Sequence, residues 1–315
     1  MLRYLTKRVV LLIGIVFVIS VGSFYLIHLL PGNPATVILG FGATPEAKAV
    51  LYKQLGLSKP IYLQYFVWLG NILHGNLGIS FISQTTVASV IRSALPIDLE
   101  IIGISQVMAF AAAIPIAMRS ARKPDGTLDR FLGAGSFTLL SIPPYILIVV
   151  LVYFVSLKWG VSATGPSAYV SGGSFFTNLE SFSLPAITLA TGSFVIYYRV
   201  LRSDLISTLQ EEFITMARSK GLSQRRIMWR HAFRPSSVAL LGAASVNIGG
   251  LIAAGFIVQY LLQIPGLGYT LILAINSSDF LVVQGIVLTV SVLVVAINFF
   301  FDFVINIVDP RISRE

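Results

Sequence analysis

Six long apolar stretches alternate with polar segments along this 315-residue chain. About twenty apolar residues in a helix cross the hydrocarbon core of a bilayer, so each stretch predicts a transmembrane helix. Pro143 and Pro144 lie inside the third stretch, where their missing backbone donors predict a kink. The six predicted spans are 9–30, 97–118, 131–157, 184–201 (the shortest), 237–262 and 280–308.

Composition supports an all-α polytopic membrane protein. Hydrophobic residues make up 56% of the chain and charged residues 11%, with a mean hydropathy of +0.85. A soluble domain carries about twice that charged fraction. The net charge of +9 comes from basic residues in short loops beside apolar spans, which is typical of topology determinants rather than nucleic-acid binding. The absence of cysteine excludes disulfides and thiolate metal sites.

The distribution of Lys and Arg predicts the orientation. Arg3, Lys7 and Arg8 precede an apolar run that is too long for a signal peptide, whose core spans about 7–15 residues. This run is therefore predicted to be an uncleaved first helix. Of the 22 basic residues, 17 lie in the two termini and in the loops 119–130 and 199–234, and five lie on the other side. Both termini are therefore predicted to be cytoplasmic.

The predicted organisation has four parts. Residues 1–30 form the N-terminal tail and first helix, and residues 31–96 form an extracytoplasmic segment that is too long for a simple connection. We expect this segment to be a small folded cap with helices near 45–55 and 61–72. Residues 97–308 form a membrane core that contains a basic loop at about 199–236, and residues 309–315 form a cytoplasmic tail.

The basic loop carries eight of the 22 basic residues and has its own helical pattern. Apolar residues from 204 to 219 recur at helical spacing and predict one buried stripe. Gly221 suits a helix C-terminus, Ser223 suits an N-cap, and Pro235 is predicted to end a second helix over 224–233. The loop is thus predicted to be helix, glycine turn, helix. The stripe consists of Leu205, Leu209, Phe213, Met216 and Ala217.

Two interpretations of this loop follow from its physical chemistry. Trp229 and the arginines around it suit the headgroup region of an anionic membrane surface; these arginines are Arg225, Arg226 and Arg230. Alternatively, the turn at 219–222 enters a groove on a cytoplasmic partner.

Catalytic constellations are scarce. His28, His74 and His231 are scattered over both predicted faces, which argues against a zinc site and an intramembrane hydrolase. The sequence contains no Gly-x-x-x-x-Gly-Lys-[Ser/Thr] motif, so any ATP that drives this protein is bound by another subunit. The acidic groups nearest the spans lie at span ends within reach of water, which argues against the rival hypothesis of a stand-alone ion-coupled carrier. These groups are Asp98, Glu100 and Asp302.

Small residues line one face of the fifth predicted span. Ser245, Gly249 and Ala253 recur every four residues, as do Ala109, Ala113 and Ala117 in the second span. Such faces let helices approach closely in lipid. We interpret the face on the fifth span as a pathway wall or as a seam with a second subunit.

Several short motifs together resemble the permease subunits of binding-protein-dependent ABC importers, in the dipeptide/oligopeptide/nickel branch. The segment 216–222, which reads Met-Ala-Arg-Ser-Lys-Gly-Leu, is similar to the EAA cytoplasmic loop of this family when it is followed by Arg-His-Ala-Phe-Arg-Pro at 230–235. Further similarities cover nearly the whole chain, at 30–34, 55–60, 65–69, 75–81, 264–268, 283–285 and 309–312.

The resemblance implies a type I importer permease with six transmembrane helices in a prokaryotic inner or plasma membrane. It implies a second homologous permease, two ATPase subunits or one fused ATPase, and an extracytoplasmic solute-binding protein. The chain itself is expected to hold no metal, cofactor or catalytic residue, since ATP and Mg are bound by the partners. The expected cargo is a di- or oligopeptide, with nickel, glutathione or a sugar as alternatives.

The resemblance also assigns residues to roles. Coupling to the ATPase is expected at Met216, Ala217, Arg218, Ser219, Lys220, Gly221 and Leu222, with loop support from Glu212, Arg230, His231 and Pro235. The expected pathway or gate residues are Ser245, Gly249, Ala253, Gln259, Pro265 and Gly266. The chain departs from the common family pattern in three places. Thr215-Met216-Ala217 stands at the Glu-Ala-Ala positions, as is common in this branch, Gln259 stands where an acidic residue is common, and Ser278-Asp279 stands in place of an Arg-Asp pair.

Overall fold

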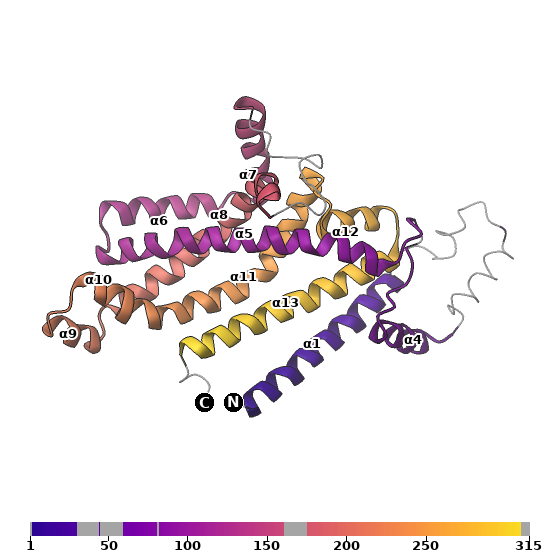
Figure 1. Ribbon diagram of the computed structural model, residues 1–315, viewed down its shortest axis with the longest axis horizontal. Helices are drawn as coiled ribbons and strands as arrows, with labels where there is room; N and C mark the ends of the chain where they lie inside the picture. The colour runs from indigo at the N-terminus through magenta and orange to yellow at the C-terminus, as the bar shows by residue number, and fades with distance from the viewer. Residues whose placement is uncertain (1, 30–43, 45–58, 81, 161–174, 310–315) are drawn as a thin grey trace. The chain divides into compact units, whose positions relative to one another are not determined.

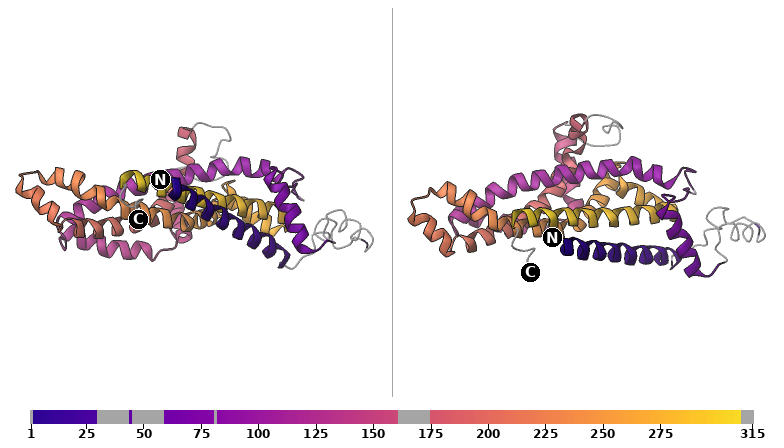
Figure 2. Two further views of the ribbon diagram at one scale, coloured as in Figure 1. Left: turned by 90° about the horizontal axis from the view of Figure 1, so that it is seen from below. Right: turned by 60° about the horizontal axis from the view of Figure 1, so that its bottom comes forward.

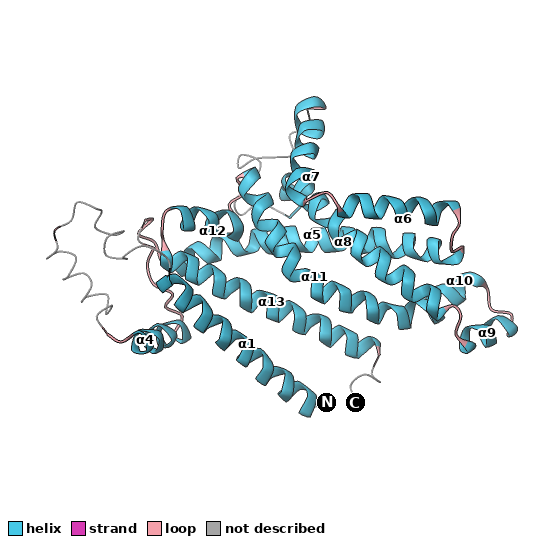
Figure 3. Ribbon diagram, turned by 180° about the vertical axis from the view of Figure 1, so that it is seen from behind, coloured by secondary structure: helices cyan, strands magenta, loops and turns pink. Residues whose placement is uncertain are grey.

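The computed structural model describes residues 2–29, 44, 59–80, 82–160 and 175–309. The regular elements in these ranges are helices (Figure 3), with one isolated antiparallel bridge between Ile79 and Thr86. Figure 1 labels the α-helices, and two π-helical segments, η1 and η2, adjoin them. The elements are α1 (Leu2–Leu29), α4 (Ile61–Leu73), α5 (Val87–Arg122), α6 (Thr127–Leu140), α7 (Pro144–Leu151), η1 (Val152–Lys158), α8 (Phe175–Thr208), α9 (Glu212–Ser219), α10 (Gln224–Arg226), η2 (Ile227–Ala232), α11 (Phe233–Leu262), α12 (Leu267–Asn276) and α13 (Phe280–Val308).

The chain forms two compact units, and Figure 2 gives two further views of their helices. The first unit comprises Met1–Ile97 and Gly266–Val295, and the second comprises Asp98–Pro265 and Ala296–Glu315. Helices α5 and α13 contribute residues to both units.

Within the described residues, four helices are long and apolar enough to cross a membrane, and a fifth crossing results if α6 and α7–η1 count as one broken span. The bounds of α13 coincide with the predicted span 280–308. Helix α5 begins ten residues before the predicted start at 97, and α8 extends beyond the predicted span at both ends. The predicted first span is helical as α1, although its described apolar part, Leu12–Tyr25, is short. The presence of six transmembrane helices therefore remains a prediction.

The third predicted span is a broken helix rather than a kinked one. Its two halves, Thr127–Ser141 and Pro144–Lys158, meet at 98°. Each proline disfavours helical geometry in the residue before it, so two adjacent prolines take the chain out of the helix. Pro143 is extended, and Pro144 starts the next helix, where a missing donor costs nothing.

In the first unit, the predicted helix near 61–72 is confirmed as α4. Tyr65 on α4 is buried, and its hydroxyl forms a 2.8 Å hydrogen bond with Ser20 on α1. Tyr65 also packs edge-on against Phe24. The expected helix near 45–55 and the motifs at 30–34 and 310–312 lie outside the described residues.

A second contact in this unit joins the turn after α4 to the start of α13. The Ser80 hydroxyl donates a 2.5 Å hydrogen bond to the Asp279 carboxylate, and both side chains are buried. Gly285 allows α13 to approach α5, since a Cβ there would lie 2.5 Å from Val87 Cγ1.

In the second unit, α8 packs mainly against α11. Tyr197 lies fully buried at the centre of this contact and stacks on Phe110 from α5, with ring centroids 4.9 Å apart. Its hydroxyl donates to Gln106 Oε1 and lies within hydrogen-bond distance of Asn247 Nδ2. A polar group buried between spans is thereby satisfied by side chains from neighbouring helices.

Candidate functional site

The basic loop is a short helix, a left-handed turn and the start of a long helix. Helix α9 ends at Ser219, and Gly221 follows with φ +73°, a conformation that glycine adopts without steric cost. Ser223 then caps the next helix, since its hydroxyl accepts a 3.4 Å hydrogen bond from the Arg226 amide. The predicted glycine turn and N-cap are both confirmed.

The predicted stripe is confirmed for Leu205, Leu209 and Ala217, which are buried, but not for the other two members, which lie on α9. Ile214 and Ala217 are buried and α9 contacts η2, whereas Phe213 is 47% exposed and Met216 is 60% exposed. The predicted single helix over 204–219 is wrong because the chain turns between Thr208 and Glu212. That turn changes the rotational phase of α9, so the stripe that includes Leu205 and Leu209 does not continue along it.

The prediction that Pro235 ends the second helix is also wrong. A continuous helical run extends from Gln224 to Leu262, and its π-helical part, η2, immediately precedes α11. A proline removes one backbone donor and crowds the carbonyl one turn earlier. A local π-type adjustment accommodates both effects in membrane helices.

The expected coupling residues lie together on the exposed side of this loop. Of the seven residues, Ala217 is buried and Leu222 is half-buried. The other five are exposed: Met216, Arg218, Ser219, Lys220 and Gly221. Beside the turn is an open hollow of about 430 Å³, lined by Ser223, Arg225, Arg226, Trp229 and Arg230. Among the expected support residues, Glu212, Arg230 and Pro235 are exposed and His231 is half-buried.

The expected gate residues differ in burial and in their contacts. Gln259 is buried, and its amide donates a 2.9 Å hydrogen bond to the Asp98 carboxylate. Asp98 is only 3% exposed, so the prediction that water reaches it is wrong for this chain. The reason is that α5 begins at Val87, which places Asp98 inside the helix rather than at its end.

The small-residue face on α11 is partly uncovered. Gly249 and Ala253 are exposed, and Ser245 donates a 3.2 Å hydrogen bond to Asn298 Oδ1. Pro265 is exposed, whereas Gly266 is buried. The role of these residues as a pathway wall or gate stays a prediction.

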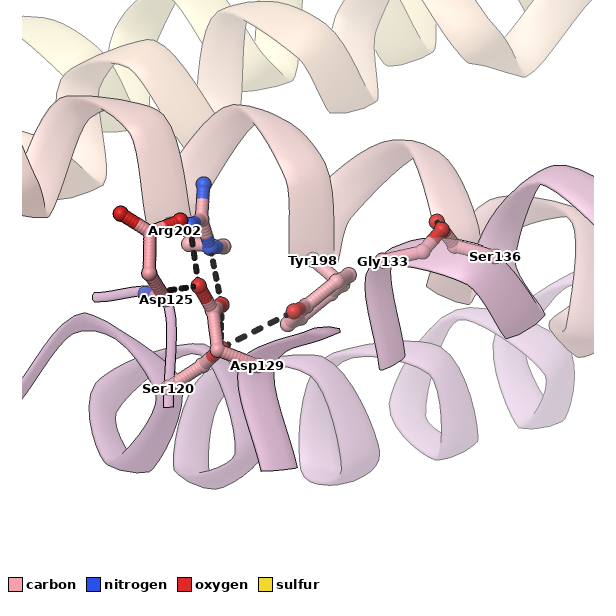
Figure 4. Close-up of polar contacts among 7 residues, drawn as sticks. All are labelled: Ser120, Asp125, Asp129, Gly133, Ser136, Tyr198 and Arg202. Atoms are coloured by element: carbon pink, nitrogen blue, oxygen red, sulfur yellow. Dashed lines mark hydrogen bonds and ion pairs between the residues drawn. The ribbon is translucent and has the colours of Figure 1, made fainter. Parts of the chain in front are cut away.

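An ion pair not anticipated from the sequence joins α6 to α8 (Figure 4). Asp129 at the start of α6 is 4% exposed and binds Arg202 on α8 through both carboxylate oxygens, from Nε and Nη2. Ser120 on α5 donates to the same carboxylate, and Tyr198 on α8 lies 3.0 Å from the Ser120 hydroxyl. The Asp125 amide donates to Asp129 Oδ2 at 2.9 Å.

The buried Asp129 carboxylate is satisfied by donors from α5, from α8 and from the turn between α5 and α6. An open hollow of about 380 Å³ adjoins it, and Arg199 in its wall stacks over the Phe137 ring at 4.2 Å. The sequence offers one weak signal for the cluster, because the loop 119–130, which is rich in Lys and Arg, contains two acidic residues, Asp125 and Asp129. The partner of Asp129 lies 73 residues away, beyond the range of local patterns.

Comparison with known proteins gives matches over the whole chain. Residues 113–314 match the family described as binding-protein-dependent transport system inner membrane component, and residues 1–102 match the N-terminal region described for the same kind of component. The chain is 29% identical over 338 residues to the dipeptide transport system permease protein of Escherichia coli. It is 30% identical over 335 residues to the di/tripeptide transport system permease protein of Pseudomonas aeruginosa.

A third relative, from Brucella suis, is provisionally named a peptide transport system permease protein and is 33% identical over 327 residues. All three alignments cover 100% of both chains. The helical architecture with several apolar helices agrees with a multi-pass membrane protein. The chain therefore belongs to the family of binding-protein-dependent transport system inner membrane components.

Proposed function

We propose that this chain is the transmembrane subunit of an ATP-driven peptide importer and forms one half of its translocation pathway. In this proposal it has six transmembrane helices with the type I importer permease fold and lies in the inner or plasma membrane of a prokaryotic cell. Both termini face the cytoplasm. The distribution of the 22 basic residues supports this orientation.

The partners in this proposal are a second homologous permease, two ATPase subunits or one fused ATPase, and an extracytoplasmic binding protein. The ATPases hold ATP and Mg, and the segment 216–222 contacts them. The observation that carries the proposal is the exposed left-handed turn at Gly221, because it belongs to a chain that aligns end to end with dipeptide permeases. Ile214 and Ala217 are buried on the side of α9 opposite its exposed residues, and α9 contacts η2.

The cargo in this proposal is a di- or oligopeptide. The names of the Escherichia coli and Pseudomonas aeruginosa relatives, which refer to dipeptides and di/tripeptides, support it. Nickel, glutathione and sugars are the alternative cargoes, and they serve as competing substrates in the test.

Affinity purification of the chain in detergent, followed by reconstitution, tests the proposal. We expect the chain to co-purify with an ATPase, a second permease and a binding protein. In proteoliposomes with ATP on the ATPase side, labelled dipeptide uptake should require both ATP and the binding protein. Uptake of nickel, glutathione or sugar in place of peptide would reassign the cargo. Transport by the purified chain alone under an ion gradient would refute the importer assignment and favour the ion-coupled carrier.

A further inference from the structure

The Asp129 cluster connects the ends of three helices through one carboxylate. Ser120 lies in the last turn of α5, Asp129 in the first turn of α6, and Arg202 in the last two turns of α8. Asp125, in the turn between α5 and α6, adds a backbone donor to the same carboxylate. One buried carboxylate therefore fixes the relative positions of three helices and one turn.

The chemistry of this contact favours a fixed geometry. Two parallel hydrogen bonds between a guanidinium and a carboxylate define both the distance and the orientation of the two groups. A buried ion pair contributes little to stability beyond what a well-packed apolar pair contributes. What the Asp129–Arg202 pair adds is a defined orientation of α6 against α8.

The end of α8 forms the first part of the basic loop and is connected to the rest of it. Helix α8 ends at Thr208, and the chain then turns directly into α9. The hydroxyls of Thr208 and Ser236 lie 3.1 Å apart and join the end of α8 to the start of α11. Helix α9 contacts η2, which precedes α11. A displacement of the loop therefore acts on α8 and α11 together, and reaches α5 and α6 through the Asp129 cluster.

We propose that Asp129 and Arg202 are positioning residues. They make the end of α5, the start of α6 and the end of α8 move as one block with the α9 part of the basic loop. This inference rests on the proposed function, in which an ATPase moves the loop during import. Without the pair, the ATPase still displaces the loop and α8, but α5 and α6 no longer move together with them. ATP is then hydrolysed with less peptide transported.

The first test compares peptide transported per ATP hydrolysed in proteoliposomes. The double variant Asp129→Asn with Arg202→Gln removes both charges, keeps hydrogen-bonding side chains and leaves no uncompensated buried charge. We expect ATP hydrolysis near the wild-type rate and about tenfold less peptide per ATP, a loss of ordinary size for a coupling free energy. The control is Arg130→Gln, which removes an exposed charge next to Asp129 and should leave the ratio unchanged.

The outcomes separate this inference from the proposed function. If the wild-type complex shows no ATP-dependent peptide uptake, the proposed function is wrong. If the wild type transports peptide and the assembled double variant has the same ratio of peptide to ATP, the positioning role is wrong.

A distance measurement remains informative even if the double variant fails to assemble. The chain contains no cysteine, so Lys123→Cys and Gln210→Cys place two spin labels on exposed sites, one between α5 and α6 and one after α8. With the pair intact, the distance between the labels should stay constant when ATP is added to the complex. A distance that changes with nucleotide in this otherwise native chain would overturn the block movement directly.

Discussion

Substitutions at Gly221 separate backbone strain from contact with a partner. At φ +73° an L-residue such as alanine costs roughly 1–2 kcal/mol, whereas asparagine occupies this region more readily. A Cβ built at Gly221 meets no atom of another described residue within 4 Å apart from its two chain neighbours, so the cost of a side chain there comes from the backbone conformation. The expected shift in the population of the native turn for Gly221→Ala is therefore about 5–30-fold, from strain alone.

Gly221→Glu adds a long anionic side chain to that strain in the segment proposed to contact the ATPase. We expect normal membrane insertion, continued ATP hydrolysis and loss of coupled peptide uptake. The assay is paired measurement of ATP hydrolysis and labelled dipeptide uptake in proteoliposomes. If backbone strain dominates, Gly221→Asn should recover most of the coupled peptide uptake that Gly221→Ala loses. If any side chain blocks the contact with the ATPase, Gly221→Asn should recover none of it.

Gly75 provides a matched control. It has φ +79° and also meets no atom within 4 Å of a built Cβ, but it lies after α4, away from the basic loop in the sequence. Gly75→Glu should therefore introduce the same backbone strain without uncoupling the transporter. Normal uptake per ATP in Gly221→Glu, or equal uncoupling in Gly75→Glu, would refute the contact at the turn.

Three further changes test local contacts. Gly285→Ala should lower the free energy of unfolding in a detergent titration by about 1–3 kcal/mol through overpacking, since its Cβ would lie 2.5 Å from Val87 Cγ1. Adding Val87→Ala to the same chain should recover part of the lost free energy. An unchanged free energy of unfolding in Gly285→Ala would contradict the close approach of the two helices. Ser223→Ala should remove an N-cap worth about 1 kcal/mol and speed amide exchange at the start of α10, so unchanged exchange would argue against the cap. Ser80→Ala should cost about 1.5–3 kcal/mol by removing a hydrogen bond from the buried Asp279 carboxylate, and a neutral effect would show that the carboxylate has other means of stabilisation.

Local signals in the sequence were sufficient to predict the structure at positions where the backbone conformation accepts only a few residue types. Gly221 and Ser223 were assigned correctly because a left-handed turn and an N-cap each favour a few residue types. The bounds of α13 were correct because polar residues, Asp279 and Asp309, flank its apolar run. The helix near 61–72 was found for a similar reason, since Pro60 precedes its apolar pattern.

Features that depend on packing could not be read from one sequence. The break between α8 and α9 is set by which residues pack beneath the loop, and it leaves Met216 exposed and Ile214 buried. Whether two prolines kink a helix or break it by 98° depends on the helices around them. The pairing of Asp129 with Arg202 joins positions 73 residues apart, and no local period reports such a contact.

The uninterrupted run from Gln224 to Leu262 connects the basic loop to the far end of α11 within one helical segment. Its 39 residues have a length of roughly 58 Å at 1.5 Å per residue. If the run stays straight, tilting it by about 5° around one end displaces the other end by about 5 Å, nearly one helical pitch. Gln259, whose amide binds Asp98, lies in the last turn of this run, and Ser223 caps its opposite end. In a run that tilts as one body, a rotation of a few degrees at the basic loop would become a shift of several ångström beside Gln259.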